Sequence, residues 1–250
     1  MGTPRILTDS YSVWWADLRI LRHLWQRFLI TSLMSPVLYL LAFGYGLGRG
    51  VKIGETSYLS FVIPGIIALT AMNTSFNSAG MKLNVDRLFY RCFDEMLMAP
   101  ISPISLILGK SLIGVLRGLI VSLVFVIIGV AISSMKVNFL FVLSLLLTCF
   151  AFSFMGVLAA LLAKSHQDMA TFSSLVLLPM TFLGGTFFPL SQLPEALKMV
   201  LYIIPLTHSS QCLRAITLGQ PFPWLSLLAI VGYGAAFFLG CVLVLRRTSV

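Results

Sequence analysis

The sequence predicts an all-α integral membrane protein with six transmembrane helices, an N-terminal amphipathic interfacial helix and an external re-entrant helical hairpin. Hydrophobic residues make up 58% of the 250 residues and charged residues only 10%, whereas an average soluble domain carries about 25% charged residues. The apolar residues form runs of about 20, which is the length that crosses a bilayer. Because the polar segments between these runs are short, we expect a single transmembrane domain over residues 1–250.

The net charge of +9 would suit a nucleic-acid-binding surface if the basic residues were clustered. They stand instead between apolar runs, which favours a topology signal, and we expect no nucleic-acid partner. The cysteines Cys92, Cys149, Cys212 and Cys241 are far apart, so neither a disulfide framework nor a zinc site is expected. The first apolar run is too long for a signal peptide.

Residues 8–27 are predicted to form an amphipathic helix on the membrane surface. Trp14, Leu18, Leu21 and Trp25 recur at helical spacing and would form its apolar face. A basic helix with tryptophans on one face suits the boundary between lipid headgroups and acyl chains. An ordinary soluble helix is the alternative.

The six predicted spans follow in order. They are residues 28–48, 58–80, 111–131, 138–163, 169–188 and 224–245. In the first span, Pro36 is expected to kink the helix, and the glycines Gly44 and Gly48 would allow close helix packing.

The second span becomes polar in its second half, around Asn73 and Asn77. Lipid cannot satisfy such side chains, so they must face protein or water. Helix packing is one explanation. A substrate path is the other, and in that case Asn73, Phe76 and Asn77 would contact the substrate.

Two segments are predicted not to span. Residues 81–110 form the longest polar segment, and a short helix from Leu88 to Ala99 would end at Pro100. A short amphipathic helix with carboxylates and exposed apolar side chains suits docking onto a protein partner. Residues 189–219 contain two helical stretches too short to cross about 30 Å at about 1.5 Å per residue. We expect them to be half-helices that enter from the outer surface.

The distribution of Lys and Arg predicts the orientation. With the N-terminus inside, basic residues near the inner ends of the spans outnumber those near the outer ends roughly two to one. Six spans then place both termini in the cytoplasm.

Few residues offer chemistry. All acidic residues are expected outside the spans, which argues against a proton- or sodium-coupled carrier. Arg117 is the one ionisable residue expected well inside a span; it could snorkel to the cytoplasmic side or contact an anionic substrate. The histidines are too scattered for a metal site, and His208 beside Ser209 and Ser210 is a weak indication of acyl chemistry. Lys110 follows a glycine, but position 104 is Ile and no strand precedes, so no phosphate-binding loop is expected.

Three motifs, in order along the chain, carry a family resemblance. Residues 61–69 (FVIPGIIAL), residues 94–103 (DEMLMAPISP) followed by Leu-Gly-Lys at 108–110, and residues 184–194 (GGTFFPLSQLP) followed by Ile-Pro-Leu-Thr at 204–207 and Leu-Arg at 213–214 resemble ABC-2 type transporter permeases. Two positions depart from the family pattern: Asp94 replaces a Glu, and Ile204 replaces an Asn.

The resemblance implies the permease subunit of an ATP-driven exporter with a type V exporter-like fold, in the drug or lipo-oligosaccharide branch. It implies a homodimer in a bacterial-type inner membrane, with two cytosolic ATP-binding subunits that hold ATP and Mg²⁺. No cofactor, metal or catalytic residue is expected on this chain. The residues implied in ATPase coupling are Arg91, Asp94, Glu95, Leu97 and Pro100. Those implied in an external gate are Phe188, Pro189 and Pro205.

The substrate would be a drug, a glycolipid or a lipo-oligosaccharide, because the apolar spans suit an amphiphilic or hydrophobic molecule. Two other classes of function stay open. One is a channel or secondary transporter that works without an ATPase. The other is a membrane-embedded, acyltransferase-like enzyme with a reactive group near His208.

Overall fold

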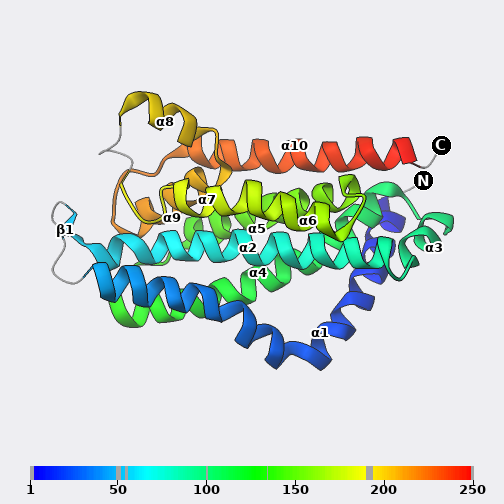
Figure 1. The fold of residues 1–250 in the computed structure, drawn as a ribbon, viewed down its shortest axis with the longest axis horizontal. Helices are drawn as coiled ribbons and strands as arrows, with labels where there is room; N and C mark the ends of the chain where they lie inside the picture. The colour runs from blue at the N-terminus through cyan, green and yellow to red at the C-terminus, as the bar shows by residue number, and fades with distance from the viewer. Residues whose placement is uncertain are drawn as a thin grey trace.

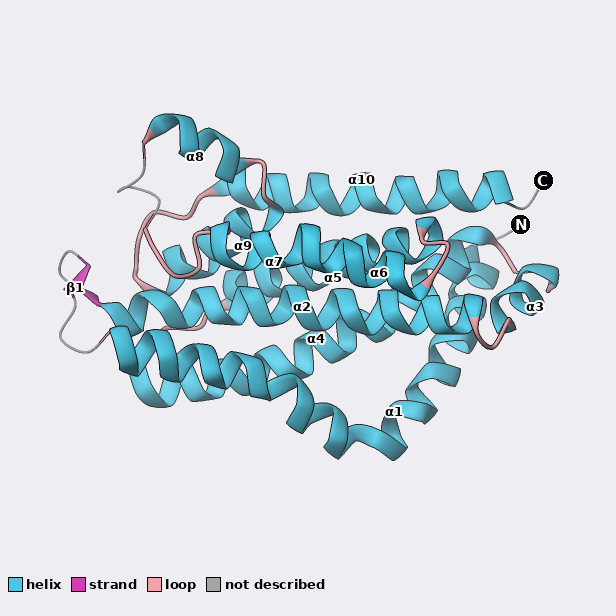
Figure 2. Ribbon diagram, viewed as in Figure 1, coloured by secondary structure: helices cyan, strands magenta, loops and turns pink. Residues whose placement is uncertain are grey.

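The computed structural model describes residues 3–48, 52–53, 56–99, 101–133, 135–189 and 194–248. These residues form a bundle of long helices that run roughly side by side (Figure 1), with one very short strand pair (Figure 2). The chain order is α1 (Thr3–Tyr39), η1 (Leu40–Leu47), β1 (Lys52–Ile53), β2 (Thr56–Ser57), α2 (Tyr58–Leu88), α3 (Cys92–Met98), α4 (Pro103–Ser133), α5 (Phe139–Leu162), α6 (His166–Phe172), η2 (Ser173–Leu177), α7 (Leu178–Leu183), α8 (Glu195–Tyr202), α9 (Pro205–Thr217) and α10 (Trp224–Thr248).

The predicted all-α membrane class is confirmed. In the described part of the chain, five helical segments are long and apolar enough to cross a membrane. They are Trp25–Gly46, Tyr58–Leu88, Pro103–Ser133, Phe139–Leu162 and Trp224–Arg247.

The count of six spans is not confirmed. In place of a single helix over 169–188, the structure has α6, the π-helical η2 and α7, which ends at Leu183. Pro179 lies at the first positions of α7, where its missing N–H is tolerated. Gly184 and Gly185 then end the run, and Gly185 has a φ of +67°, which a residue with a Cβ rarely adopts.

The core centres on α2. In an apolar 18-residue stretch of α2, 83% of the residues are buried within the protein, whereas in the corresponding stretch of α10 only 11% are buried. Glycines allow a close crossing between α2 and α5: a Cβ on Gly156 would lie 2.5 Å from the carbonyl oxygen of Phe76, and one on Gly80 would lie 2.8 Å from the carbonyl oxygen of Gly156. The glycines Gly44 and Gly48 likewise pack against α2, on Leu59 and Tyr58.

The first helix differs from the prediction. α1 runs through the expected boundary between 8–27 and 28–48 without a break, although it bends strongly (Figure 1). Its buried face is Ser10, Val13, Asp17 and Leu21. Of the predicted apolar face, Leu21 is thus buried, whereas Trp25 is 52% exposed. The physical reason is that the buried face packs on α4, where Gly109 admits Val13. Its position at the membrane surface stays a prediction.

The two ends of the bundle carry different elements. Both chain ends and α3 lie at one end, whereas β1 and α8 lie at the other (Figure 1). α8 has 8 residues and α9 has 13, so each is shorter than a span, as expected of half-helices. Which end faces the cytoplasm stays a prediction.

Candidate functional site

A polar cleft of about 660 Å³ opens on one side of the bundle, between α1, α2, α4 and the η2–α7 run. Polar side chains of α1 and α2 face each other across it. The residues that line it are Phe28, Thr31, Ser32, Ser35, Pro36, Tyr39, Leu69, Thr70, Asn73, Thr74, Asn77, Ser78, Arg117, Ser173, Leu177, Leu178, Thr181 and Phe182.

Two of the three predicted pathway residues lie in this cleft. Asn73 and Asn77 both line it, and Asn77 is exposed, with its Nδ2 donating to the carbonyl oxygen of Asn73 at 2.8 Å. Phe76 does not line the cleft, and its contact with a substrate stays a prediction. Its side chain is fully buried and stacks on Phe172 with the ring centroids 5.6 Å apart. Residues 73 and 77 are one helical turn apart, whereas Phe76 points toward α6 on the neighbouring face.

The sequence analysis missed the α1 side of the cleft. Thr31, Ser32 and Ser35 line it, and the spacing of Thr31 and Ser35 by four residues places them on one helical face. Thr31 donates to the carbonyl oxygen of Arg27 at 2.8 Å, which satisfies the hydroxyl within the helix. The sequence therefore did contain an indication of this side of the cleft, namely small polar residues one helical turn apart in the first span.

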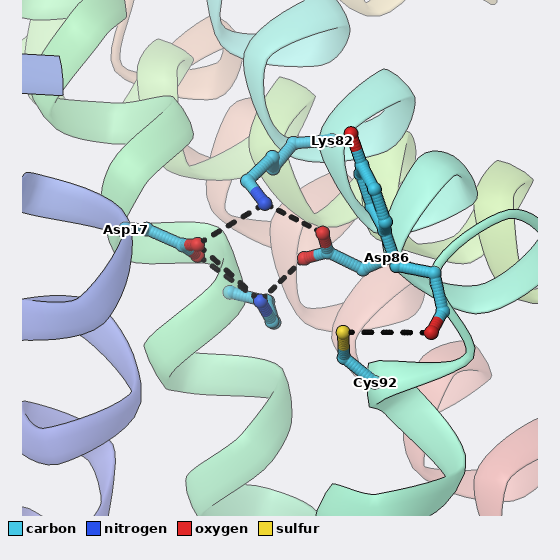
Figure 3. Close-up of polar contacts among 6 residues, drawn as sticks. Asp17, Lys82, Asp86 and Cys92 are labelled. Atoms are coloured by element: carbon cyan, nitrogen blue, oxygen red, sulfur yellow. Dashed lines mark hydrogen bonds and ion pairs between the residues drawn. The ribbon is translucent and has the colours of Figure 1, made fainter. Parts of the chain in front are cut away.

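A second polar feature is a buried cluster of four charges near the α3 end of the bundle. The side chains of Asp17 (α1), Lys82 and Asp86 (both α2) converge there (Figure 3). Lys110 of α4 joins them, with Nζ 2.7 Å from Asp86 Oδ2 and 3.2 Å from Asp17 Oδ2. Asp17, Asp86 and Lys110 are each no more than 4% exposed. Two acids and two bases compensate each other, which a buried charge requires.

The charge cluster lies where two helices extend beyond the predicted spans. The helix α2 continues past the predicted span 58–80 to Leu88, and α4 begins at Pro103, ahead of the span predicted from 111. Asp86 lies in this extension of α2, and the position of the acidic residues outside the membrane stays a prediction. The helices continue through these polar residues because the charges are paired with one another.

The segment around α3 was predicted to dock a partner. α3 covers Cys92–Met98, shorter than the predicted 88–99, because α2 continues to Leu88 and Arg91 adopts a left-handed φ of 55° before α3 begins. Glu95 is exposed, and Phe89, Tyr90 and Met98 are 71%, 62% and 87% exposed. This end of the bundle therefore presents apolar and acidic side chains together.

For three of the other predicted coupling residues, the structure does not describe the side chain. Asp94 and Leu97 lie within α3, but their side chains are outside the described part of the structure, and Pro100 is outside the described residues. Neighbouring Arg87 has a structural role: its Nη1 donates to the carbonyl oxygens of Ala160, Leu161 and Ala163 at 2.8–3.0 Å. It thereby satisfies the last carbonyls of α5.

The predicted gate residues lie at the opposite end of the bundle. Phe188 is partly buried against the core, and Pro205 is a buried first residue of α9. Pro189 lines a second cavity of about 440 Å³ together with Phe61 and Arg214. Their opening and closing stays a prediction.

Arg214 fixes this end of the structure. Its guanidinium donates to the carbonyl oxygens of Phe61 at 3.2 Å and of Gly185 at 2.9 Å, and it stacks over the Phe61 ring at 3.7 Å. One side chain of α9 thus ties α2 to the segment after α7.

The three residues considered for acyl chemistry, His208, Ser209 and Ser210, form hydrogen bonds with other parts of the protein and not with one another. Ser209 bonds with Thr148 Oγ1 at 3.0 Å, and Ser210 donates to the carbonyl oxygen of Gly184 at 3.0 Å. His208 contacts Ser226 Oγ at 3.3 Å through Nδ1 and the carbonyl oxygen of Tyr202 at 2.8 Å through Nε2. Among the residues that the structure describes, no three His, Cys, Asp or Glu side chains are close enough to hold a metal ion.

A helical membrane bundle with a polar cleft in its side and a short exposed helix at one end has the build of a membrane permease. The ABC-2 type transporter family matches residues 10–218, and the chain belongs to this family.

Curated relatives support the assignment over nearly the whole chain. The inner membrane transport permease YadH of Escherichia coli K12 is 28% identical over 243 residues, which cover 94% of each chain. Nodulation protein J of Rhizobium meliloti is 30% identical over 236 residues, or 89% of each chain. Nodulation protein J of Neorhizobium galegae is 27% identical over 232 residues, or 90% of this chain and 87% of its own.

Proposed function

We propose that this chain is the permease half of an ATP-driven exporter that moves an amphiphilic or hydrophobic molecule out of the cytoplasm or the inner leaflet. The observation that carries the proposal is the cleft of about 660 Å³ between α1, α2 and η2–α7. Many of its lining side chains are polar, although α1, α2 and α4 contain segments apolar enough to cross a membrane. Polar groups at that depth need protein, water or a ligand, and a passing amphiphile supplies both polar and apolar contacts.

The path is completed by a second copy of the chain. Exposed apolar side chains flank the cleft on both sides, with Met34 and Leu38 of α1 61% and 55% exposed and Leu175 and Leu178 of the η2–α7 run 70% and 57% exposed. Two such faces, related by a two-fold axis, would bury these residues and enclose the two clefts. The substrate then passes between the subunits, in contact with Asn73 and Asn77.

The energy comes from two cytosolic ATP-binding subunits, which hold ATP and Mg²⁺. They dock at the end of the bundle that carries α3, where Glu95 and Met98 are exposed. The charge cluster lies next to this docking segment and joins α1, α2 and α4. Movement of α3 is therefore transmitted to the helices that line the cleft.

The location is the bacterial inner membrane, with both termini and α3 in the cytoplasm. The relative YadH is named an inner membrane transport permease, which supports this location. Both termini and α3 lie at the same end of the bundle (Figure 1), which supports one shared side.

The test is transport by the permease reconstituted with its ATP-binding subunit. Asp94→Lys with Glu95→Lys on α3 should leave ATP hydrolysis but abolish ATP-dependent export of a fluorescent amphiphile. Glu195→Lys is the matched control, since Glu195 is an exposed acid on α8 at the opposite end. Unchanged export in the double variant would refute the coupling role of α3. Export that needs no ATP would favour a channel or secondary transporter instead.

A further inference from the structure

The polar cleft contains a single charged side chain among the described residues that line it, and that side chain is Arg117 of α4. The other polar groups of the lining are neutral hydroxyls and amides, among them Ser32, Asn73 and Asn77. The described lining therefore carries a positive charge and no carboxylate, and Asp17, the acid that acts on Arg117 electrostatically, is already paired with Lys82 and Lys110.

Arg117 has unused hydrogen-bonding capacity. No carboxylate of the described residues lies within 4.0 Å of it, and its Nε is buried without a hydrogen-bond partner. Its guanidinium carbon lies 4.9 Å from the centre of the Phe28 ring, a cation–π contact that uses none of its N–H donors in a hydrogen bond. A guanidinium has five N–H donors in one plane.

The other cations of the bundle show what is unusual about Arg117. Lys82 and Lys110 are paired with Asp17 and Asp86, and Arg214 donates to backbone carbonyls. Each of these cations has a structural partner within the chain. An arginine inside a membrane helix costs about 2.5–3.5 kcal/mol on insertion scales and usually marks a functional site.

We infer that Arg117 binds a negatively charged group of the amphiphile that the cleft takes up, an inference that rests on the function proposed above. The ligand class is an amphiphile whose hydroxylated headgroup bears a phosphate, sulfate or carboxylate. The anion meets the guanidinium edge in a bidentate pair. The headgroup hydroxyls meet Ser32, Asn73 and Asn77, and the alkyl chain lies against Leu178 and Phe182 at the apolar edge.

The experiment uses the whole 250-residue chain in nanodiscs of phosphatidylcholine and two probes that differ by one phosphate group. The probes are octyl β-D-glucoside and octyl β-D-glucoside 6-phosphate, each below its critical micelle concentration, with binding measured by calorimetry. The wild type should bind the phosphorylated probe about tenfold more tightly, since a hydrogen bond to a charged group supplies that much. Arg117→Gln should bind both probes equally, at the affinity of the neutral one.

Two further variants separate a specific site from a general charge effect. Arg117→Lys should keep part of the preference, because an ammonium retains the charge but not the bidentate geometry. Lys136→Gln removes an exposed charge between α4 and α5 and should keep the full preference. If Arg117→Gln fails to insert, Asn77→Asp provides the test. The added carboxylate should weaken binding of the phosphorylated probe more than binding of the neutral probe, so that the preference for the phosphorylated probe falls.

Equal affinity of the wild type for both probes, or a preference that persists in Arg117→Gln, would overturn the inference. Nanodiscs that contain phosphatidylglycerol distinguish the source of the anion. Competition by this lipid identifies a lipid headgroup, and its absence identifies a glycosylated amphiphile; both uphold the site. Binding is measured without ATP. A failure of ATP-driven export would therefore contradict the proposed function but would not affect the binding result for Arg117.

Discussion

The ammonium of Lys110 lies 3.2 Å from a carboxylate oxygen of Asp17, although 93 positions separate the two residues in the chain. Lys110 also contacts Asp86 at 2.7 Å, so one buried cation holds the first helix and the second helix to the fourth. The charge cluster is thus the polar junction of the helices that form the cleft. It lies at the same end of the bundle as α3, which links the two parts of the candidate site.

Removing this cation should destabilise the protein strongly. Lys110→Met leaves Asp17 and Asp86 buried with only Lys82 as a shared partner, and breaking a buried ion pair costs about 3–5 kcal/mol. We expect a clearly lower melting temperature of the purified protein. The control is Lys136→Met, which removes an exposed lysine and should have little effect.

A fully neutral version of the cluster provides the second arm. Replacing Asp17 and Asp86 with Asn and Lys82 and Lys110 with Gln leaves no uncompensated charge, so this variant should be more stable than Lys110→Met. If Lys110→Met melts like the wild type, the cluster does not hold the helices together.

The sequence predicted the class of the fold, but not how the helix ends are paired. Composition and run length suffice for a helical membrane protein, because the bilayer imposes both. The charge cluster could not be predicted from run length, since its pairing joins Asp17 to Lys110 across the chain. Polarity alone indicated that the second span ends near residue 80, whereas partners from α1 and α4 allow the helix α2 to continue to Leu88.

As with the fold, only part of the candidate site could be predicted from the sequence. Asn73 and Asn77 were identified because polar residues are conspicuous in an apolar span. Phe76 lies next to Asn77 in the sequence, but helical geometry places it on another face. Arg117 was noticed as an isolated charge, but its place opposite α1 in the cleft required the packing of four segments.

The crossing of α2 and α5 should not tolerate a methyl group at Gly156. A Cβ there would lie 2.5 Å from the carbonyl oxygen of Phe76, so the helices must separate. Overpacking of this kind costs about 1–3 kcal/mol, and we expect Gly156→Ala to lower the melting temperature. A Cβ on Gly232 of α10 would meet nothing within 4 Å, so Gly232→Ala should be neutral. Equal stability of the two variants would show that the two helices can separate at no cost.

Arg214 should be required for the attachment of α9. Arg214→Met keeps much of the apolar stem but leaves the carbonyl oxygens of Phe61 and Gly185 without their donor. A buried unsatisfied group costs about 1–3 kcal/mol, and we expect faster proteolysis between α7 and α9 together with a lower melting temperature. Arg214→Lys should be intermediate, because one ammonium cannot reach acceptors in the same fork geometry. Wild-type resistance of Arg214→Met to protease would contradict this role.

The stability of the first turn of α6 should depend on pH, because Asp168 caps it. Ser165 and Asp168 form a capping box: Ser165 Oγ accepts from the Asp168 amide, and the Asp168 carboxylate accepts from the amides of Lys164 and Ser165. The hydrogen bond from the Lys164 amide is the main reason that the pKa of Asp168 lies below its ordinary value of 3.8. A lowered pKa in the folded state means that the cap stabilises the helix above the ordinary Asp pKa and is lost as the pH falls through the lowered value.

Hydrogen exchange of the amides in residues 169–172 measures this dependence. After correction for intrinsic rates, protection should be constant from neutral pH down to about 4 and should fall below that. Asp168→Asn should show lower protection with no such decrease, since its amide side chain does not titrate. Ser165→Ala should lower protection at every pH by about 1 kcal/mol, the usual contribution of an N-cap. A decrease at low pH that persists in Asp168→Asn would assign the titration to another group.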